Sequence, residues 1–138
     1  AGPAVSFLTP TMSHFTTIRT QLVEASYLEK ALVDLGHTVQ RGPVTVNGFM
    51  GNKTEADLKI GTASKNYDIG FRRNGPYYEL VADWWGIKGI EQGAFVKKLT
   101  QRYAYHAAQE ALIAEGFSLV EEEQQQDGTL HLVLRRSV

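Results

Sequence analysis

The feature that most constrains the fold is a run of short strand-like segments in the middle of the chain. Alternating apolar and polar residues recur there, with breaks at glycine or proline and an Asn74-Gly75 pair typical of a hairpin turn. This pattern predicts antiparallel strands at residues 39–41, 44–46, 58–63, 67–71 and 77–84. Because Pro76 cannot donate a ladder hydrogen bond, we expect the turn after Asn74 to be longer than two residues.

Two helical segments flank these strands. In the first, Leu28, Ala31, Leu32 and Leu35 recur at helical spacing, Ser26 and Glu29 fit a capping box, and Gly36 is the expected stop. The second runs from about residue 91 to residue 115 and ends at a glycine. A strand over residues 14–22 precedes the first helix. A hairpin over residues 118–123 and 130–135 follows the second.

The order strand, helix, several strands, helix, two strands predicts an α+β fold. We expect a curved, mainly antiparallel sheet with the two main helices on one face, because that arrangement buries both helices. Each helix follows a strand and leads into another, which indicates a weak internal βαβ duplication. One shared core is predicted for eight apolar residues: Leu28, Leu32, Leu35, Ile69, Phe71, Leu80, Leu119 and Leu132.

The organisation predicted along the chain is one domain over residues 12–138. Met12-Ser13-His14 has the form of a natural start, so residues 1–11 are interpreted as a leader, either a cloning remnant or a processed segment. This first stretch lacks the basic segment and the long apolar core of a signal peptide. No apolar run approaches the roughly 20 residues of a membrane span.

Composition excludes several classes of function. Without cysteine the fold has no disulfide, zinc–thiolate site or iron–sulfur cluster, and a net charge of -1 gives no global basic field for nucleic acid. The four histidines, at positions 14, 37, 106 and 131, show neither HxH nor HExxH spacing, so we expect no metal and no cofactor.

Catalytic and phosphate-binding motifs are also missing from the sequence. No G-x-S-x-G elbow occurs, and the glycines between residues 42 and 51 match no phosphate loop. Glu121-Glu122-Glu123 is interpreted as a solvated edge strand, whose charge resists pairing with other edges, rather than as an acid–base pair. An enzyme would therefore need a site assembled from scattered residues such as Arg102, Tyr103 and His106.

Several segments resemble, in order, a known family. The chain from Met12 to Arg136 is similar to the plastid and cyanobacterial "hypothetical chloroplast reading frame thirty-five" family, a domain of unknown function. The segments that carry the resemblance are Met12-Ser13-His14-Phe15 with Ile18, Thr20 and Gln21, then Tyr67–Phe71, Tyr78–Asp83, Gln101–Tyr105, Gly116-Phe117 and Asp127-Gly128. The resemblance implies a soluble protein of the cytoplasm or plastid stroma of a phototroph. It implies no activity.

One region of surface is predicted to bind a partner: Phe49, Met50, Arg72, Arg73 and Trp85. Phe49 and Met50 lie between glycines, where no periodic packing would bury them. Arg72 should face away from the core if Phe71 faces it, Arg73 lies near the hairpin tip, and Trp84 and Trp85 cannot share one face of a regular strand. Aromatic and arginine side chains are common at binding hot spots. The alternative is that Phe49 and Trp85 only close the ends of the core.

These observations favour a non-catalytic binding or assembly module for a protein partner in a phototroph. The first alternative is a small RNA-binding regulator, because basic residues between Lys59 and Arg102 are mixed with Tyr77, Trp84 and Trp85. The second alternative is the enzyme with no recognisable motif. Homo-oligomerisation is left open by the sequence.

Overall fold

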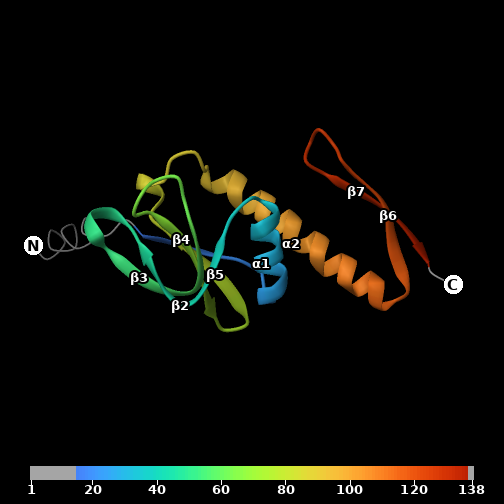
Figure 1. Cartoon of the computed structure of the whole chain (residues 1–138), viewed down its shortest axis with the longest axis horizontal. Helices are drawn as coiled ribbons and strands as arrows, with labels where there is room; N and C mark the ends of the chain where they lie inside the picture. Colours follow the sequence, from blue (N-terminus) through green and yellow to red (C-terminus); the bar gives the residue numbers. More distant parts are fainter. Residues whose placement is uncertain (1–14, 137–138) are drawn as a thin grey trace, which may run out of the picture.

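The computed structural model describes residues 15–136, which form a five-stranded antiparallel sheet, two helices and a separate two-stranded ribbon (Figure 1). In the sheet the strands follow the order β1-β5-β4-β3-β2. The strands and helices are β1 (Thr16–Arg19), α1 (Ala25–Asp34), β2 (Val39–Asn47), β3 (Lys53–Gly61), β4 (Asp68–Asn74), β5 (Tyr77–Ala82), α2 (Gln92–Ala114), β6 (Phe117–Gln124) and β7 (Leu130–Arg136). The α+β class and the antiparallel sheet are confirmed. The expected leader, residues 1–11, lies outside the described residues, as does His14 at the start of the first expected strand.

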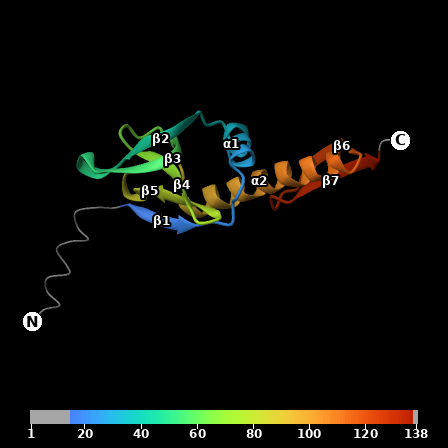
Figure 2. The same cartoon turned by 90° about the horizontal axis from the view of Figure 1, so that it is seen from below.

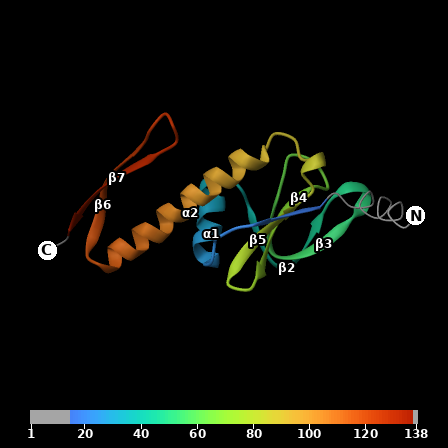
Figure 3. The same ribbon diagram turned by 180° about the vertical axis from the view of Figure 1, so that it is seen from behind.

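The main core lies between one face of the sheet and the two helices (Figure 2). Of the eight residues expected in one core, Leu28, Leu32, Ile69, Phe71 and Leu80 are all fully buried in it, and Leu35 packs against it half-buried. For Leu119 and Leu132 the prediction is wrong. Both belong to the β6–β7 ribbon, which is a separate sheet beside the second half of α2 (Figure 3).

Helix α1 begins two residues earlier than its capping box predicts. Its N-cap is Glu24, with no side-chain capping bond, so the Ser26–Glu29 box is wrong. The Glu29 carboxylate instead accepts a hydrogen bond from Arg41 Nε at 2.6 Å, which joins the helix to β2. The stop at Gly36 is confirmed, because this residue has φ +92, a left-handed conformation that glycine adopts without steric cost.

The β4–β5 turn is shorter than Pro76 suggests. Asn74 pairs with Tyr77, which leaves only Gly75 and Pro76 in the turn, so the expectation of a longer turn is wrong. Pro76 lies between the strands, where no ladder hydrogen bond is required of it. Gly75 supplies the positive φ, +66, that tight hairpin turns need.

The β2–β3 hairpin folds over the outer face of the sheet, the face without helices. The expected break at Gly42-Pro43 is a bulge inside one continuous strand, since the β2–β3 register shifts between Arg41 and Val44. Beyond the bulge, Val46 and Ala56 are buried outside the main core, and a Cβ on Gly70 would lie 2.3 Å from Val46 Cγ2. Gly70 therefore lets the hairpin lie directly on β4, and this curvature carries the hairpin tip toward the end of β5.

Helix α2 is longer than the sheet that it covers. Its predicted limits, residues 91 and 115, are its two caps in the structure. Phe95 and Leu99 are its buried residues, and the second half extends past the sheet with the β6–β7 ribbon beside it (Figures 1 and 2). The two strand–helix–strand units suggested by the sequence therefore end in different sheets. Within residues 15–136 no helix is long and apolar enough to cross a membrane.

Candidate functional site

The strongest candidate site is an exposed apolar cluster built from two short 3-10 turns. One turn, η3 (Phe49–Gly51), forms the tip of the β2–β3 hairpin, and the other, η4 (Trp84–Gly86), follows β5. The Phe49 and Trp85 rings meet edge to face, with centroids 4.8 Å apart. Met50 is 85% exposed and Trp85 is 66% exposed. We call Phe49, Met50 and Trp85 the apolar ledge.

A buried carboxylate holds the two turns together. Asp83 is fully buried between β5 and η4, and its Oδ2 accepts a hydrogen bond from the Phe49 backbone N–H at 2.7 Å. Gly48 allows this approach, since a Cβ there would lie 3.1 Å from Asp83 Cβ and 2.8 Å from the Phe15 ring. Sequence reasoning missed Asp83. The available signal was an acid placed directly between an apolar strand and two tryptophans.

The backbone of Met50 is in a conformation that methionine rarely adopts. Its φ and ψ are 50° and 40°, in the left-handed region, which costs a non-glycine residue about 1–2 kcal/mol. Two backbone hydrogen bonds of 2.9 Å, Gly48 N to Asn52 O and Asn52 N to Phe49 O, fix the turn around it. A large apolar side chain thus occupies a position that suits glycine, and points into solvent.

The two tryptophans point in different directions, although not because they alternate on a strand. The strand ends at Ala82, and both tryptophans lie in η4. Trp84 packs against the buried Phe95, with ring centroids 6.2 Å apart, while Trp85 joins Phe49 at the surface. Gly86 lets the Tyr67 ring lie directly against η4, since a Cβ there would lie 2.0 Å from that ring.

Three exposed lysines belong to the segments around the two turns: Lys53 lies two residues after η3, Lys88 lies two residues after η4, and Lys65 lies in the β3–β4 loop. This loop rests against the segment after η4, because the Lys88 N–H donates to Ser64 Oγ at 2.9 Å. Glu55, two residues after Lys53, is the acidic neighbour on β3. We call Lys53, Lys65 and Lys88 the lysine rim. Against Glu55, the lysine rim gives the segments beside the two turns a positive excess.

The two arginines predicted for the site are engaged elsewhere. Arg72 lies on the outer face of the sheet, where Nε donates to Glu79 Oε1 at 2.9 Å and Nη1 to Thr54 Oγ1 at 3.2 Å. Arg73 lies over the Tyr78 ring at 4.4 Å and donates to backbone oxygens of Pro76 and Val23. The structure therefore groups three of the five predicted residues. The binding role of all five stays a prediction.

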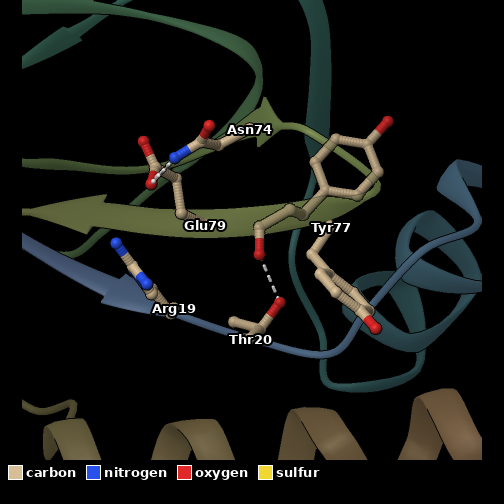
Figure 4. A pocket seen from close by; sticks show the side chains of 6 residues that line it. Arg19, Thr20, Asn74, Tyr77 and Glu79 are labelled. Atoms are coloured by element: carbon tan, nitrogen blue, oxygen red, sulfur yellow. Dashed lines mark hydrogen bonds between the residues drawn. The ribbon is translucent and has the colours of Figure 1, made fainter.

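A polar pocket of about 260 Å³ opens beside β1 and the β4–β5 turn, lined by Arg19, Thr20, Asn74, Tyr77, Tyr78 and Glu79 (Figure 4). Glu79 is almost completely buried, and hydrogen bonds from Asn74 and Arg72 hold the pKa of its carboxyl below the usual range. A carboxylate held charged by two donors is a poor general base. Glu79 is therefore a poor candidate for an acid–base residue.

The residues of the enzyme alternative form part of a structural polar cluster. Asp34 Oδ2, at the end of α1, lies 2.8 Å from Arg102 Nη2 and 2.6 Å from His106 Nε2, both on α2. Arg102 Nη1 donates to Glu122 Oε1 on β6 at 3.1 Å. The Tyr103 hydroxyl oxygen instead accepts hydrogen bonds from the Val23 and Glu24 N–H groups, at 3.0 Å and 2.8 Å. These side chains satisfy one another and join α1, α2 and β6.

Among the described residues no group of three or more acids, histidines or cysteines is arranged to hold a metal.

This cluster predicts a specific pH dependence of stability. Partial burial acts to raise the pKa of Asp34, but hydrogen bonds from Arg102 and His106 outweigh it and hold the pKa below the ordinary 3.8. Such a carboxylate stabilises the fold above its unfolded-state pKa, and this contribution is lost as pH falls through the depressed value. The free-energy difference between wild type and Asp34→Asn should therefore be near its full size at about pH 5 and narrow as the pH falls further. Urea denaturation across a pH series measures this difference, and a constant difference down to pH 2 would contradict the prediction.

Comparison with known proteins shows the family. The family described as "Protein of unknown function (DUF1257)" matches residues 31–133, and the chain belongs to it. A relative named "Uncharacterized protein ycf35" from Cyanophora paradoxa is 35% identical over 128 residues, which are 91% of this chain and 98% of the relative. Proteins of the same name from Guillardia theta and Pyropia yezoensis are 38% and 34% identical over the same shares. The resemblance inferred from the sequence is thus confirmed. No solved structure matches the chain.

Proposed function

We propose that this protein is a non-catalytic binding module that holds a protein partner on the apolar ledge. The observation that carries the proposal is Met50, whose side chain is 85% exposed on a backbone conformation unfavourable for methionine. Residues kept in costly conformations cluster at functional positions. Methionine and tryptophan are also common at protein-binding surfaces, where a flexible side chain adapts to its partner and a large ring anchors it.

The surroundings of the ledge indicate the chemistry of the partner. The lysine rim is exposed, whereas the nearby Asp83 is buried and the Asp68 carboxylate is paired with Lys59 at 3.2 Å. Charges across an interface are arranged to be complementary. We therefore infer a partner segment that carries apolar anchors with acidic residues beside them.

A protein fits this surface better than RNA does. Single-stranded RNA needs aromatic faces on which successive bases stack. Phe49 meets Trp85 at an interplanar angle of 82°, so the two rings do not present parallel faces. The net charge of -1 adds no general attraction for phosphates. The compartment that we propose, the cytoplasm or plastid stroma of a phototroph, rests on the family resemblance.

Photo-crosslinking from position 50 tests the proposal. A photoreactive amino acid replaces Met50 in cells that make the chain, and a matched chain carries it at Tyr77, which is 45% exposed at the other end of β5. We expect one polypeptide to be captured from position 50, through a segment with acidic and apolar residues, and not from position 77. Capture of RNA alone from position 50 would favour the RNA-binding alternative. Equal capture of the same polypeptide at both positions would contradict the proposal.

A further inference from the structure

The C-terminal part of the described chain has no fully buried residue of its own. Leu99 is the last buried side chain, and between residues 100 and 136 every side chain is half-buried or exposed. This part is nevertheless rich in apolar residues: Leu119, Leu130, Leu132 and Leu134 are half-buried, and Val120 and Val133 are 52% and 49% exposed. A segment with this composition is typical of a surface that another chain covers.

The β6–β7 ribbon leaves both of its outer edges open. Its two strands pair only with each other among residues 15–136, and the ribbon stands clear of the five-stranded sheet (Figures 1 and 3). An isolated pair of strands is marginally stable in water, and each open edge presents unpaired backbone N–H and C=O groups. Some of this ribbon's stability comes from α2, through the hydrogen bonds of Arg102 to Glu122 and of Gln101 to Gly128 O.

The two edges differ in charge. β6 carries Glu121, Glu122 and Glu123, which protect its edge because a second carboxylate strand would be repelled. β7 has the sequence Leu-His-Leu-Val-Leu-Arg-Arg, with no carboxylate and four apolar residues. The edge of β7 is therefore the one suited to receive another strand.

We propose that β7 pairs with β7 of a second copy of this chain, antiparallel and centred on Val133. The two ribbons then form one four-stranded sheet across a two-fold axis, which is the commonest symmetry of homo-oligomers. This proposal is independent of the function proposed for the apolar ledge, which lies at the other end of the molecule.

The sequence of β7 is self-complementary in this register. Val133 lies opposite Val133 of the second copy, and Leu132 lies opposite Leu134 of that copy. The leucines lie on the face toward α2, since Leu130 and Leu132 line a shallow groove with Ala104 and Ala108 of that helix. The leucine rows of the two ribbons therefore join into one apolar surface over the two helices. His131 lies opposite Arg135 of the second copy. Within its own ribbon His131 pairs with Glu123, so a carboxylate lies in the same cross-strand row as these two basic side chains.

Charge also explains why the assembly would stop at two chains. After the β7 edges pair, the outer edges of the four-stranded sheet are the two β6 strands with their glutamates. These edges repel each other, so the sheet does not grow into a fibre. The alternative, β6 of one copy on β7 of the next, brings glutamates near Arg135 but makes a head-to-tail contact that need not close.

Molecular mass in solution, measured by light scattering over a range of concentrations, tests the proposal. We expect the wild-type mass to double as concentration rises. Val133→Lys replaces the apolar pair on the axis by two charged side chains, each beside Glu121 of its own ribbon, so this variant should stay monomeric. Val120→Lys is the matched control, because Val120 is equally exposed but lies on β6, and it should dimerise as the wild type does. Mixing Val133→Lys chains with Val133→Glu chains should restore a dimer with one chain of each kind, which also shows that both variants are folded.

Four outcomes would overturn the proposal. The first is a wild-type chain that stays monomeric up to its solubility limit. The second is a dimer that survives Val133→Lys, which would put the interface elsewhere. The third is a dimer that is lost equally in Val120→Lys, which would implicate β6. The fourth is a mass that keeps growing with concentration, which would indicate the head-to-tail contact between β6 and β7.

Discussion

Leu32→Ala will lower the free energy of unfolding by about 2–5 kcal/mol, because it removes a fully buried side chain from the centre of the main core. Leu32 lies on the buried stripe of α1 and belongs to the same core cluster as the sheet residues Phe71 and Leu80. The loss combines the transfer of the removed methyl and methylene groups with the cavity that rigid neighbours leave open. Chemical denaturation measures it as a lower midpoint with an unchanged slope.

Val33→Ala is the matched control for this prediction. Val33 is the next residue on the same helix but is 59% exposed, so its truncation should change stability by no more than about 0.5 kcal/mol. Similar losses for the two variants would mean that α1 does not present its Leu28–Leu32 stripe to the sheet. That result would contradict the layer arrangement itself.

Trp85→Ala will weaken binding of the protein partner by about 2 kcal/mol or more, close to a thirtyfold increase in Kd. Trp85 supplies the largest exposed ring of the apolar ledge, and truncation also removes the ring contact that supports Phe49. The clamp from Asp83 to the Phe49 N–H stays in place, so the fold should be nearly as stable as in the wild type. Titration of the crosslinked partner with wild type and variant gives the ratio of the two Kd values.

Tyr77→Ala is the control for the tryptophan. Tyr77 is also a half-exposed aromatic residue, but it lies at the start of β5, whereas η4 and Trp85 follow the end of that strand. Its truncation should leave the Kd within a factor of about three, the effect expected of a residue outside the interface core. A larger loss for Tyr77→Ala than for Trp85→Ala would move the binding surface to the other end of the sheet.

The sequence was sufficient to predict most elements and the main core, because those depend on local periodicity. The alternation in residues 67–84 and the stripe in residues 28–35 each determine which side chains face inward. Leu119 and Leu132 follow the same alternation, yet they are in a different sheet. Periodicity identifies the apolar face of a strand but not the layer against which that face packs. For Leu119 and Leu132 this layer is the second half of α2, which extends past the five-stranded sheet.

The failures near helix α1 and the β4–β5 turn have local causes. The Ser26–Glu29 pattern competes with a tertiary hydrogen bond from Arg41, which takes the Glu29 carboxylate. Pro76 has no backbone N–H, which argues against a short turn only if a hydrogen bond from this position is required. In the two-residue turn no such hydrogen bond is required. The first error arises because Arg41 lies outside the sequence window that the capping pattern uses.

The candidate site could be predicted only in part. Phe49 and Met50 were identifiable because glycines on both sides make periodic burial impossible. Trp85 was chosen on the expectation that the two tryptophans alternate on a regular strand, whereas the strand ends at Ala82. Arg72 and Arg73 were grouped with them on strand geometry, but their acceptors come from β3, β5 and the segment before α1. The role of Asp83 depends on the curled β2–β3 hairpin, which no local pattern encodes.

The most direct test of the central claim is a paired measurement on Met50→Gly, of its Kd for the crosslinked partner and of its free energy of unfolding. Glycine suits the left-handed backbone at φ 50, so the unfolding free energy should not fall. If Met50 is kept for binding, the Kd should rise at least tenfold, a loss of about 1.4 kcal/mol. A lower unfolding free energy with an unchanged Kd would instead show that Met50 serves the fold, and would contradict the assignment of the apolar ledge as the binding site.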